Sequence, residues 1–479
     1  MILRETLQVA VKGGAVVSAT VIVRYAVGLA TQIALARMLE PQQFGQIAFA
    51  VSFVMFFNAF TNWHGDKFAI WSNDDHHKML NVAFTMELCM SIVMAAAAFF
   101  IAPLVMEWLG KDELTIYAQF MALAFFYNPF SRPRALLERE LKFVQSKIPF
   151  LVSQALSAVI AVAMAYQGYG IWSLIAWRLS NLFVETTLLW MLCRNRPRLC
   201  WDAGVLKQLV VYSGPLMGSA FLTYLCYNID YLIVGVVLEN GEEQLGFYWL
   251  GFQAGAYFLV MRQIFYNVLF PLFSRSKDDV VKEKIFSKLT ISVGGAFLLP
   301  ALLAIFFAPE LILLAFGPKW GPAIAPFQIL MFTFLSRAIS ANAGYYLYSK
   351  GLTQVEFNVV LMNVVLLAPL AFGLTLTNGI VGASIAVCLA HTATILYSFE
   401  RYIKPLTQKG VFAYFGWPWA FALIAMIVSN VCDSLGRPLF LLCICFAVLL
   451  LAAYIIVWRP IVNDITRLAR LLRTSSGEC

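Results

Sequence analysis

Charged residues are scarce in this sequence. Asp, Glu, Lys and Arg make up 13% of the 479 residues, about half of the roughly 25% that is usual for soluble domains. Hydrophobic residues make up 61%, and the mean hydropathy is +0.77. These values exclude an ordinary soluble protein and predict an all-α polytopic membrane protein.

The sequence also lacks the residue patterns that commonly hold metals or carry out catalysis. The histidines, His64, His76, His77 and His391, are too few and too dispersed to argue for a metal centre. The nine cysteines are dispersed, mostly inside apolar runs, and lack metal-ligand spacing. No Gly-rich phosphate loop, HExxH motif or DxD pair at a membrane edge occurs. The sequence therefore predicts neither an enzyme nor a bound metal or organic cofactor.

Long apolar runs fill most of the chain. About 20 apolar residues cross the hydrocarbon core of a bilayer, and charge clusters and Gly or Pro turns separate such runs here. The expected spans are 14–38, 41–62, 80–103, 113–131, 148–166, 170–193, 208–237, 244–270, 288–308, 322–346, 356–376, 378–399, 412–432 and 438–458. We therefore predict about 14 transmembrane helices joined by loops too short for a soluble domain.

The positive charges predict the orientation of these helices. Of the 34 Lys and Arg residues, 26 fall on one side of the predicted membrane, and only Arg37, Lys111, Lys319 and Arg437 fall on the other. The remaining four, Arg24, Arg178, Arg262 and Arg337, lie within predicted spans. Because cytoplasmic loops carry the excess of positive charge, we expect both termini in the cytoplasm. The net charge of +8 follows from this topology and from nearby anionic lipid headgroups, so no nucleic-acid partner is predicted.

Two similar hinges divide the chain into halves. Residues 36–45 and 235–246 each join one long span to the next through a Leu-Glu pair, a turn and an apolar-Gly step. They follow the first and the seventh span, so both lie on the same side of the membrane and the repeat is parallel. We expect an N-terminal lobe of six helices at 1–203, a C-terminal lobe of six helices at 204–403, and two helices with a basic tail at 404–479.

Arginine inside a span is the strongest functional signal in the sequence. Such a residue costs at least about 2.5 to 3.5 kcal/mol on insertion scales, so it normally faces protein or a water-filled cavity. Arg24 and Arg262 lie near the middle of helices in opposite halves, and neither has an acidic residue three or four positions away. Guanidinium groups bind phosphate and pyrophosphate bidentately. Arg24 and Arg262 are therefore the predicted substrate-binding residues of a central cavity.

Other polar residues within the spans have two interpretations each. Arg178 and Glu185 share a helix face with Asn181, and the three form either an internal network or part of the cavity. Tyr224 and Asn228 belong to a polar stripe that is either a cavity wall for hydroxyl-rich ligands or a core seam.

Three charged residues complete the candidate set. Glu87 either couples transport to H⁺ or makes a helix–helix hydrogen bond, and Arg337 either neutralises a neighbouring acid or lines the cavity. Asp230 lies near the outer end of its span, where a carboxylate reaches water or caps a turn. Coupling to Na⁺ or H⁺ through Glu87 or Asp230 stays open at this point.

Several stretches, in this order along the chain, resemble a known family. They are 35–49 (LARMLEPQQFGQIAF), 131–143, 230–235 followed by 245–248, 270–275, and 316–320 (FGPKW). They resemble the Wzx-type polysaccharide flippases of the multidrug/oligosaccharidyl-lipid/polysaccharide (MOP) exporter superfamily. One departure is Tyr231, where members of this family commonly place a basic residue after the aspartate.

The resemblance implies a fold, a substrate and partners. The implied fold is MATE-like, with two six-helix lobes and two additional C-terminal helices. The implied substrate is an undecaprenyl-pyrophosphate-linked oligosaccharide repeat unit, flipped across the bacterial inner membrane for O-antigen, capsule or exopolysaccharide synthesis. Its partners would be membrane lipids, a polysaccharide polymerase and a chain-length regulator. Arg24 and Arg262 lie in the helices that match those whose arginines meet the pyrophosphate in related flippases.

Three alternatives fit the sequence less well. A MATE-like ion-coupled exporter of small cationic molecules needs a cavity lined with acids and aromatic rings, whereas the central charges here are arginines. A membrane-bound sugar polymerase or ligase needs a large outer loop with catalytic residues, which this chain lacks. A structural scaffold leaves the arginines inside the spans unexplained.

Overall fold

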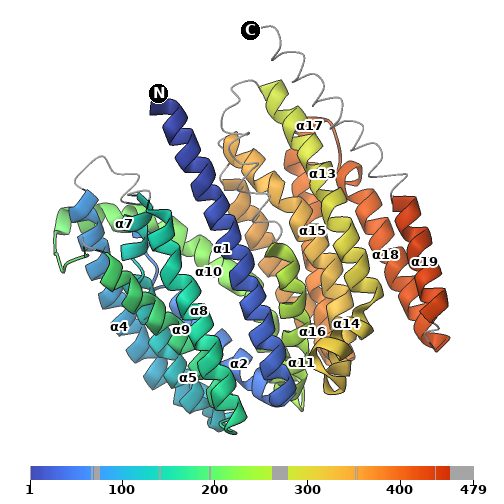
Figure 1. Cartoon of the computed structure of the whole chain (residues 1–479), viewed down its shortest axis with the longest axis horizontal. Coiled ribbons are helices and arrows are strands. Elements are labelled where there is room, and N and C mark those ends of the chain that lie inside the picture. Colours follow the sequence, from blue (N-terminus) through green and yellow to red (C-terminus); the bar gives the residue numbers. More distant parts are fainter. Residues whose placement is uncertain are drawn as a thin grey trace. The chain divides into compact units, whose positions relative to one another are not determined.

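The computed structural model of the chain is built from helices. It describes residues 2–65, 68, 76–139, 142–193, 196–260, 279–350, 352, 354–436 and 439–453, and every regular element in these ranges is helical (Figure 1). The helices form two compact units. Unit 1 comprises 1–250, 315–320 and 360–383, and unit 2 comprises 251–314, 321–359 and the residues from 384 onward. The predicted division into lobes at 203/204 and 403/404 stays a prediction.

The first half of the chain contributes its helices to unit 1. They are α1 (Ile2–Met38), α2 (Pro41–Asn58), α4 (His76–Trp108), η1 (Asp112–Leu114), α5 (Thr115–Met121), η2 (Ala122–Phe126), α6 (Tyr127–Phe130), α7 (Pro133–Arg139), α8 (Phe143–Tyr166), α9 (Ile171–Leu192), α10 (Ala203–Val237) and most of α11 (Gly241–Ala256).

The second half contributes most of its helices to unit 2. They are η3 (Tyr257–Leu259), α13 (Asp279–Phe306), α14 (Ala308–Phe316), η4 (Pro318–Ala323), α15 (Ile324–Ser349), α16 (Gln354–Ser398), η5 (Phe399–Ile403), α17 (Lys404–Thr407), α18 (Phe412–Ser434) and α19 (Leu439–Ala453). The end of α14, the start of η4 and the middle of α16 belong to unit 1.

The apolar helices confirm an all-α polytopic membrane protein. Eight helical stretches among the described residues are long and apolar enough to cross a bilayer, and each predicted span contains a helix within its described part. The predicted spans 356–376 and 378–399 meet inside α16, where Asn378 and Gly379 leave helical geometry and Gly379 has a φ of +57°. The count of 14 membrane crossings stays a prediction.

Local signals in the sequence set where helices begin. Glu40 and Gln43 form a capping box at the start of α2, and Pro41 occupies the first helical turn, where its missing N–H costs nothing. Asp202 accepts hydrogen bonds at 2.9 and 3.0 Å from two backbone amides in the first turn of α10. Both helix starts are therefore determined by residues within one turn of the boundary.

Small residues hold α8 against its neighbours in unit 1. Ser153, Ser157, Ala161 and Ala165 recur every four residues on α8, and all are buried. Asn181 of α9 donates through Nδ2 to the hydroxyls of Ser153 (3.4 Å) and Ser157 (3.3 Å). Small residues at this spacing let helix backbones approach closely in a membrane. As a result α9 and α1 both pack on α8 (Figure 1).

The two predicted hinges lie against each other within unit 1. A Cβ atom on Gly45 would overlap the backbone carbonyl of Glu242. A Cβ atom on Gly246 would overlap the carbonyl of Pro41. The contact is reciprocal, because in each hinge the carbonyl lies four residues before the glycine. Such an exchange is expected when two copies of one motif meet about a two-fold axis, and it supports the predicted repeat.

Three of the basic residues predicted on the outer side make contacts that involve the two hinges. Lys111 forms an ion pair with Glu242 at 3.3 Å. Lys319 donates to the backbone carbonyl of Leu39 at 2.6 Å, and Arg37 donates to a backbone carbonyl of α14 at 2.8 Å. Three of the four exceptions to the positive-inside pattern therefore have a structural role in unit 1.

Unit 2 has its own core of aromatic and hydroxyl side chains. Within it, α13, α15 and α18 pack together. Trp419 donates through Nε1 to Ser336 Oγ at 2.8 Å, and Tyr414 Oη and Ser287 Oγ share a hydrogen bond of 2.9 Å. These bonds satisfy polar atoms that are buried among apolar helices.

Candidate functional site

Arg24 meets aromatic rings and reaches accessible space. It lies on α1, its side chain is exposed, and its guanidinium is 4.4 Å from the centroid of the Phe150 ring and 5.3 Å from that of Tyr25. No acidic side chain among the described residues forms an ion pair with it. A cation over an aromatic face is held by the ring quadrupole without loss of its charge. Arg24 therefore keeps its positive charge available to a ligand.

A second arginine shares the same aromatic ring. The guanidinium of Arg134, at the start of α7, lies 5.9 Å from the Phe150 centroid. Arg134 also forms an ion pair with Glu185 of α9 and donates to Tyr127 Oη at 3.2 Å. The Tyr127 hydroxyl in turn donates to the Glu185 carboxylate at 3.4 Å. We name Arg24, Phe150, Arg134, Glu185 and Tyr127 the Phe150 cluster.

The Phe150 cluster has a net positive charge. It holds two guanidiniums and one carboxylate, that of Glu185, which pairs with Arg134; Glu185 is buried, Arg134 is partly exposed and Arg24 is exposed. Accessible guanidiniums next to apolar and aromatic surface are suited to phosphate oxyanions, which accept their parallel N–H groups. The arrangement can bind an anionic group, and it holds no side chain placed as a nucleophile.

The structure separates Arg178 from the network predicted for it. Arg178 forms no hydrogen bond or ion pair with another described residue, while Glu185 and Asn181 on the same helix find partners on α7 and α8. Arg178 lies on the protein-facing stripe of α9, between the buried Ile175 and Glu185, yet its own side chain is exposed. It therefore reaches accessible space on the side of α9 that faces protein.

Glu87 takes part in a closed ion pair. Arg132 donates to both carboxylate oxygens of Glu87, each at 2.5 Å, and also to Asn62 Oδ1 at 3.1 Å. The backbone amide of Trp63 donates to Glu87 Oε1 at 3.2 Å. This geometry joins α4, the segment after α2 and the residue before α7. It favours the structural interpretation of Glu87 over ion coupling, because the carboxylate is already occupied.

Tyr224 and Asn228 join α10 to α2. The Tyr224 hydroxyl donates to the backbone carbonyl of Ser52 at 2.8 Å, and the Ser52 hydroxyl lies 3.5 Å from Asn228 Oδ1. Tyr224 is buried, and Asn228 Nδ2 donates back to the Tyr224 carbonyl. Of the two interpretations of this polar stripe, the contacts favour the core seam.

The remaining candidates are Asp230 in unit 1, Arg337 in unit 2 and Arg262 outside the described residues. Of the two possibilities for Asp230, reaching water or capping a turn, burial argues against the first: the side chain is buried and accepts a 2.5 Å hydrogen bond from the Tyr248 hydroxyl. Arg337, in unit 2, is buried with its guanidinium 5.9 Å from the Phe334 ring centroid. Arg262 lies outside the described residues, so its predicted role stays a prediction.

Sequence reasoning missed Arg132 and Arg134 because both were assigned to a cytoplasmic loop. A signal for them was present. Glu87 and Glu185 fall inside spans, where a lone carboxylate is costly, so each requires a basic partner. The basic residues just after the fourth span were among the candidates, and the structure gives one arginine to each glutamate.

Two curated relatives align with most of the chain. The lipopolysaccharide biosynthesis protein WzxC of Escherichia coli (strain K12) is 25% identical over 81% of this chain and 79% of its own length. The succinoglycan biosynthesis transport protein ExoT of Rhizobium meliloti (strain 1021) is 24% identical over 84% of this chain and 82% of its own length.

Two solved structures share the fold. The lipid II flippase MurJ, in an inward closed conformation, has a TM-score of 0.66 at 13% identity and covers 94% of this chain and 99% of its own. A multidrug resistance MATE family transporter of the MOP superfamily, in an inward-facing conformation, has a TM-score of 0.60 at 15% identity and covers 81% of this chain and 99% of its own.

These likenesses place the chain among polytopic helical membrane proteins with the fold of the MOP-superfamily transporters. Residues 34–325 match the family described as Polysaccharide biosynthesis protein. The chain belongs to this family. The matched residues contain every stretch on which the resemblance to polysaccharide flippases rests, so that resemblance is confirmed.

Proposed function

We propose that this protein is a flippase for undecaprenyl-pyrophosphate-linked oligosaccharide repeat units. It works by alternating access in the bacterial inner membrane, with both termini in the cytoplasm, and is not an enzyme. The names of its relatives support the assignment, since one is a lipopolysaccharide biosynthesis protein and another a succinoglycan biosynthesis transport protein. The product enters O-antigen, capsule or exopolysaccharide synthesis through a polymerase and a chain-length regulator.

The observation that carries the proposal is the accessible charge of Arg24. Placing a guanidinium in an apolar helix is costly, and here the side chain lies over the rings of Tyr25 and Phe150 and forms no ion pair with a described acidic residue. A pyrophosphate repays that cost, because it supplies the negative charge that no described residue supplies. Arg134 adds a second guanidinium beside the same ring, and Arg262 is the counterpart that the sequence predicts in the other half.

The mechanism needs only binding and a change of conformation. The cationic cluster binds the pyrophosphate headgroup from the cytoplasm while the polyprenyl chain remains in lipid. The ligand promotes the outward transition in so far as the two conformations differ in affinity for it. A cavity for cationic drugs requires unpaired acids, whereas Glu87 and Glu185 are both neutralised by arginines.

The test follows lipid-linked repeat units on each face of the inner membrane. Cells carry Arg24→Ala, Arg24→Lys or the matched control Arg198→Ala, an exposed arginine outside the Phe150 cluster, at equal protein levels. We expect Arg24→Ala to trap the units on the cytoplasmic face, Arg24→Lys to restore part of the traffic, and Arg198→Ala to behave as the parent. Normal traffic in Arg24→Ala would remove this residue from the mechanism.

A further inference from the structure

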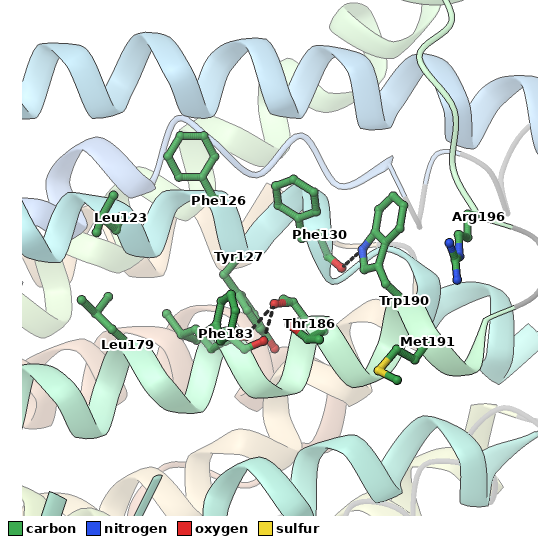
Figure 2. A pocket seen from close by; sticks show the side chains of 12 residues that line it. Leu123, Phe126, Tyr127, Phe130, Leu179, Phe183, Thr186, Trp190, Met191 and Arg196 are labelled. Carbon is green, nitrogen blue, oxygen red and sulfur yellow. Dashed lines mark hydrogen bonds between the residues drawn. The ribbon is translucent and has the colours of Figure 1, made fainter. Parts of the chain in front are cut away.

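A groove runs along the side of unit 1 between α9 and residues 123–130. Its volume is about 510 Å³, within the range of about 300–1,000 Å³ that is usual for sites holding a small molecule. The lining is mostly apolar and aromatic, as Figure 2 shows: it includes Leu123, Phe126, Phe130, Leu179, Phe183 and Met191.

The groove opens on an apolar surface of unit 1. Leu123, Phe183 and Met191 are exposed apolar side chains on its rim. Leu123 belongs to η2, whereas Phe183 and Met191 lie on the face of α9 directed away from Glu185, which points toward protein. Residues 170–193 are a predicted membrane span, so we expect these exposed apolar side chains to face lipid chains and a lipid to enter the groove from the side without crossing water.

The length of the groove matches one leaflet of a bilayer. From Leu179 to Met191, α9 rises about 18 Å at about 1.5 Å per residue. One leaflet of the hydrocarbon core is about 15 Å thick, half of about 30 Å. The groove therefore fits a single acyl chain of a membrane lipid, and it is too short for the much longer polyprenyl chain of the carrier.

A fixed positive charge lies at one end of the groove. Arg196 follows the C-terminal end of α9 and lines the groove beyond Trp190 (Figure 2). Its side chain is exposed and forms no hydrogen bond or ion pair with another described residue. The segment that carries it is held on α4, because the backbone amides of Arg198 and Cys200 donate to Asn81 Oδ1 and Thr85 Oγ1, both at 2.9 Å.

We propose that this groove binds an anionic phospholipid of the cytoplasmic leaflet, with one acyl chain between α9 and residues 123–130 and the phosphate at Arg196. The predicted orientation places Arg196 on the cytoplasmic side. Basic pockets between membrane helices on that side bind acidic headgroups. The site depends on the groove and on Arg196, and it does not require that the chain transport a lipid-linked sugar.

The first experiment measures the charge preference of the groove. The purified full-length protein is reconstituted with spin-labelled phosphatidylglycerol or phosphatidylcholine, and the immobilised fraction of each lipid is measured. We expect Arg196→Gln to reduce the preference for phosphatidylglycerol about fivefold, since one basic residue near a membrane surface contributes about 1 kcal/mol. Arg198→Gln, the matched control, should leave the preference unchanged. Equal immobilisation of both lipids by the parent protein would overturn the proposal, as would an unchanged preference in Arg196→Gln.

The second experiment fills the groove. Thr187 lines it and is exposed, so Thr187→Trp should abolish the immobilised component for both lipids. Val159→Trp is the control, because Val159 is 65% exposed on α8 and does not line the groove. Unlabelled undecaprenyl phosphate is then added as a competitor. If it displaces phosphatidylglycerol at a lower concentration than unlabelled phosphatidylglycerol does, the groove belongs to the polyprenyl carrier and the proposal is wrong.

Discussion

Arg132 and Arg134 are two residues apart and each neutralises a glutamate from another helix, yet the two ion pairs differ in accessibility. In the Arg132–Glu87 pair the side chains are 8% and 0% exposed, whereas in the Arg134–Glu185 pair they are 27% and 2% exposed. Arg132 also bonds to Asn62, while Arg134 lies beside the ring that holds Arg24. From this difference we expect the closed pair to stabilise the fold and the open pair, which lies next to a further guanidinium, to contribute to ligand binding.

The closed pair should give the largest effect when it is broken. Arg132→Ala leaves Glu87 buried without its partner, and we expect it to destabilise the protein by about 3–5 kcal/mol. The thermal midpoint of the purified protein in detergent measures this, with Arg134→Ala as the comparison. Replacing both partners, as Arg132→Met with Glu87→Leu, should recover most of the loss. Equal shifts for Arg132→Ala and Arg134→Ala would remove the distinction between the two pairs.

The contact between the two hinges can be tested in the same way, although it involves no charged side chain. Gly45→Ala places a Cβ atom against the Glu242 carbonyl, so one backbone must move, and we expect a loss of about 1–3 kcal/mol. Gly214→Ala is the control, because no atom lies within 4 Å of a Cβ at that helical position. Both variants are measured by thermal unfolding. A Gly45→Ala protein as stable as the Gly214→Ala protein would contradict a tight contact between the hinges.

The open pair should affect transport in addition to stability, because Arg134→Ala leaves the buried Glu185 with the Tyr127 hydroxyl but without its basic partner. Arg134→Ala removes one of two guanidiniums beside Phe150, and we expect the outward traffic of lipid-linked repeat units to fall about tenfold, equivalent to about 1.4 kcal/mol. Arg134→Lys keeps the charge and should retain part of the traffic. Traffic is measured at equal protein level beside the thermal midpoint of each variant. If traffic falls only in proportion to the amount of folded protein, the pair is structural in both places.

The smallest effect should come from a pair at the surface. Lys78 and Asp202 are 2.6 Å apart, with side chains 48% and 31% exposed. The hydrogen bond from Lys78, and next that from the Val205 amide, hold the pKa of Asp202 below its ordinary value of 3.8. A carboxyl whose pKa is lowered by folding stabilises the protein above its ordinary pKa, and this contribution is lost as the pH falls through the lowered value.

The measurement is the thermal midpoint between neutral pH and about pH 3. Asp202→Asn should flatten the acid part of the curve slightly, and Lys78→Met should shift that part toward higher pH. Identical curves for the parent and both variants would show that this exposed pair does not contribute to stability.

By itself, the sequence determined the features that depend only on residues close together in the chain. Apolar runs predicted the helices, because each backbone group in a bilayer must be satisfied within its own helix. The capping box at Glu40 and Gln43 fixed the start of α2, and the similarity of the two hinges predicted the repeat. Arg24 was predicted to be functional because a charge in an apolar run is costly wherever the helix lies; that role stays a prediction.

Only the tertiary structure decided which residues meet. Glu87 and Arg132 are 45 residues apart, so no helical spacing relates them, and their bonding follows from how α4 packs on the residues before α7. The same is true of Phe150 of α8, for which the sequence carried no functional signal. Its ring lies beside Arg24 of α1 and Arg134 of α7. The groove at Arg196 likewise forms between separate segments of unit 1. Local energetics fix each helix, whereas ion pairs, aromatic contacts and cavities depend on the packing of helices that are distant in sequence.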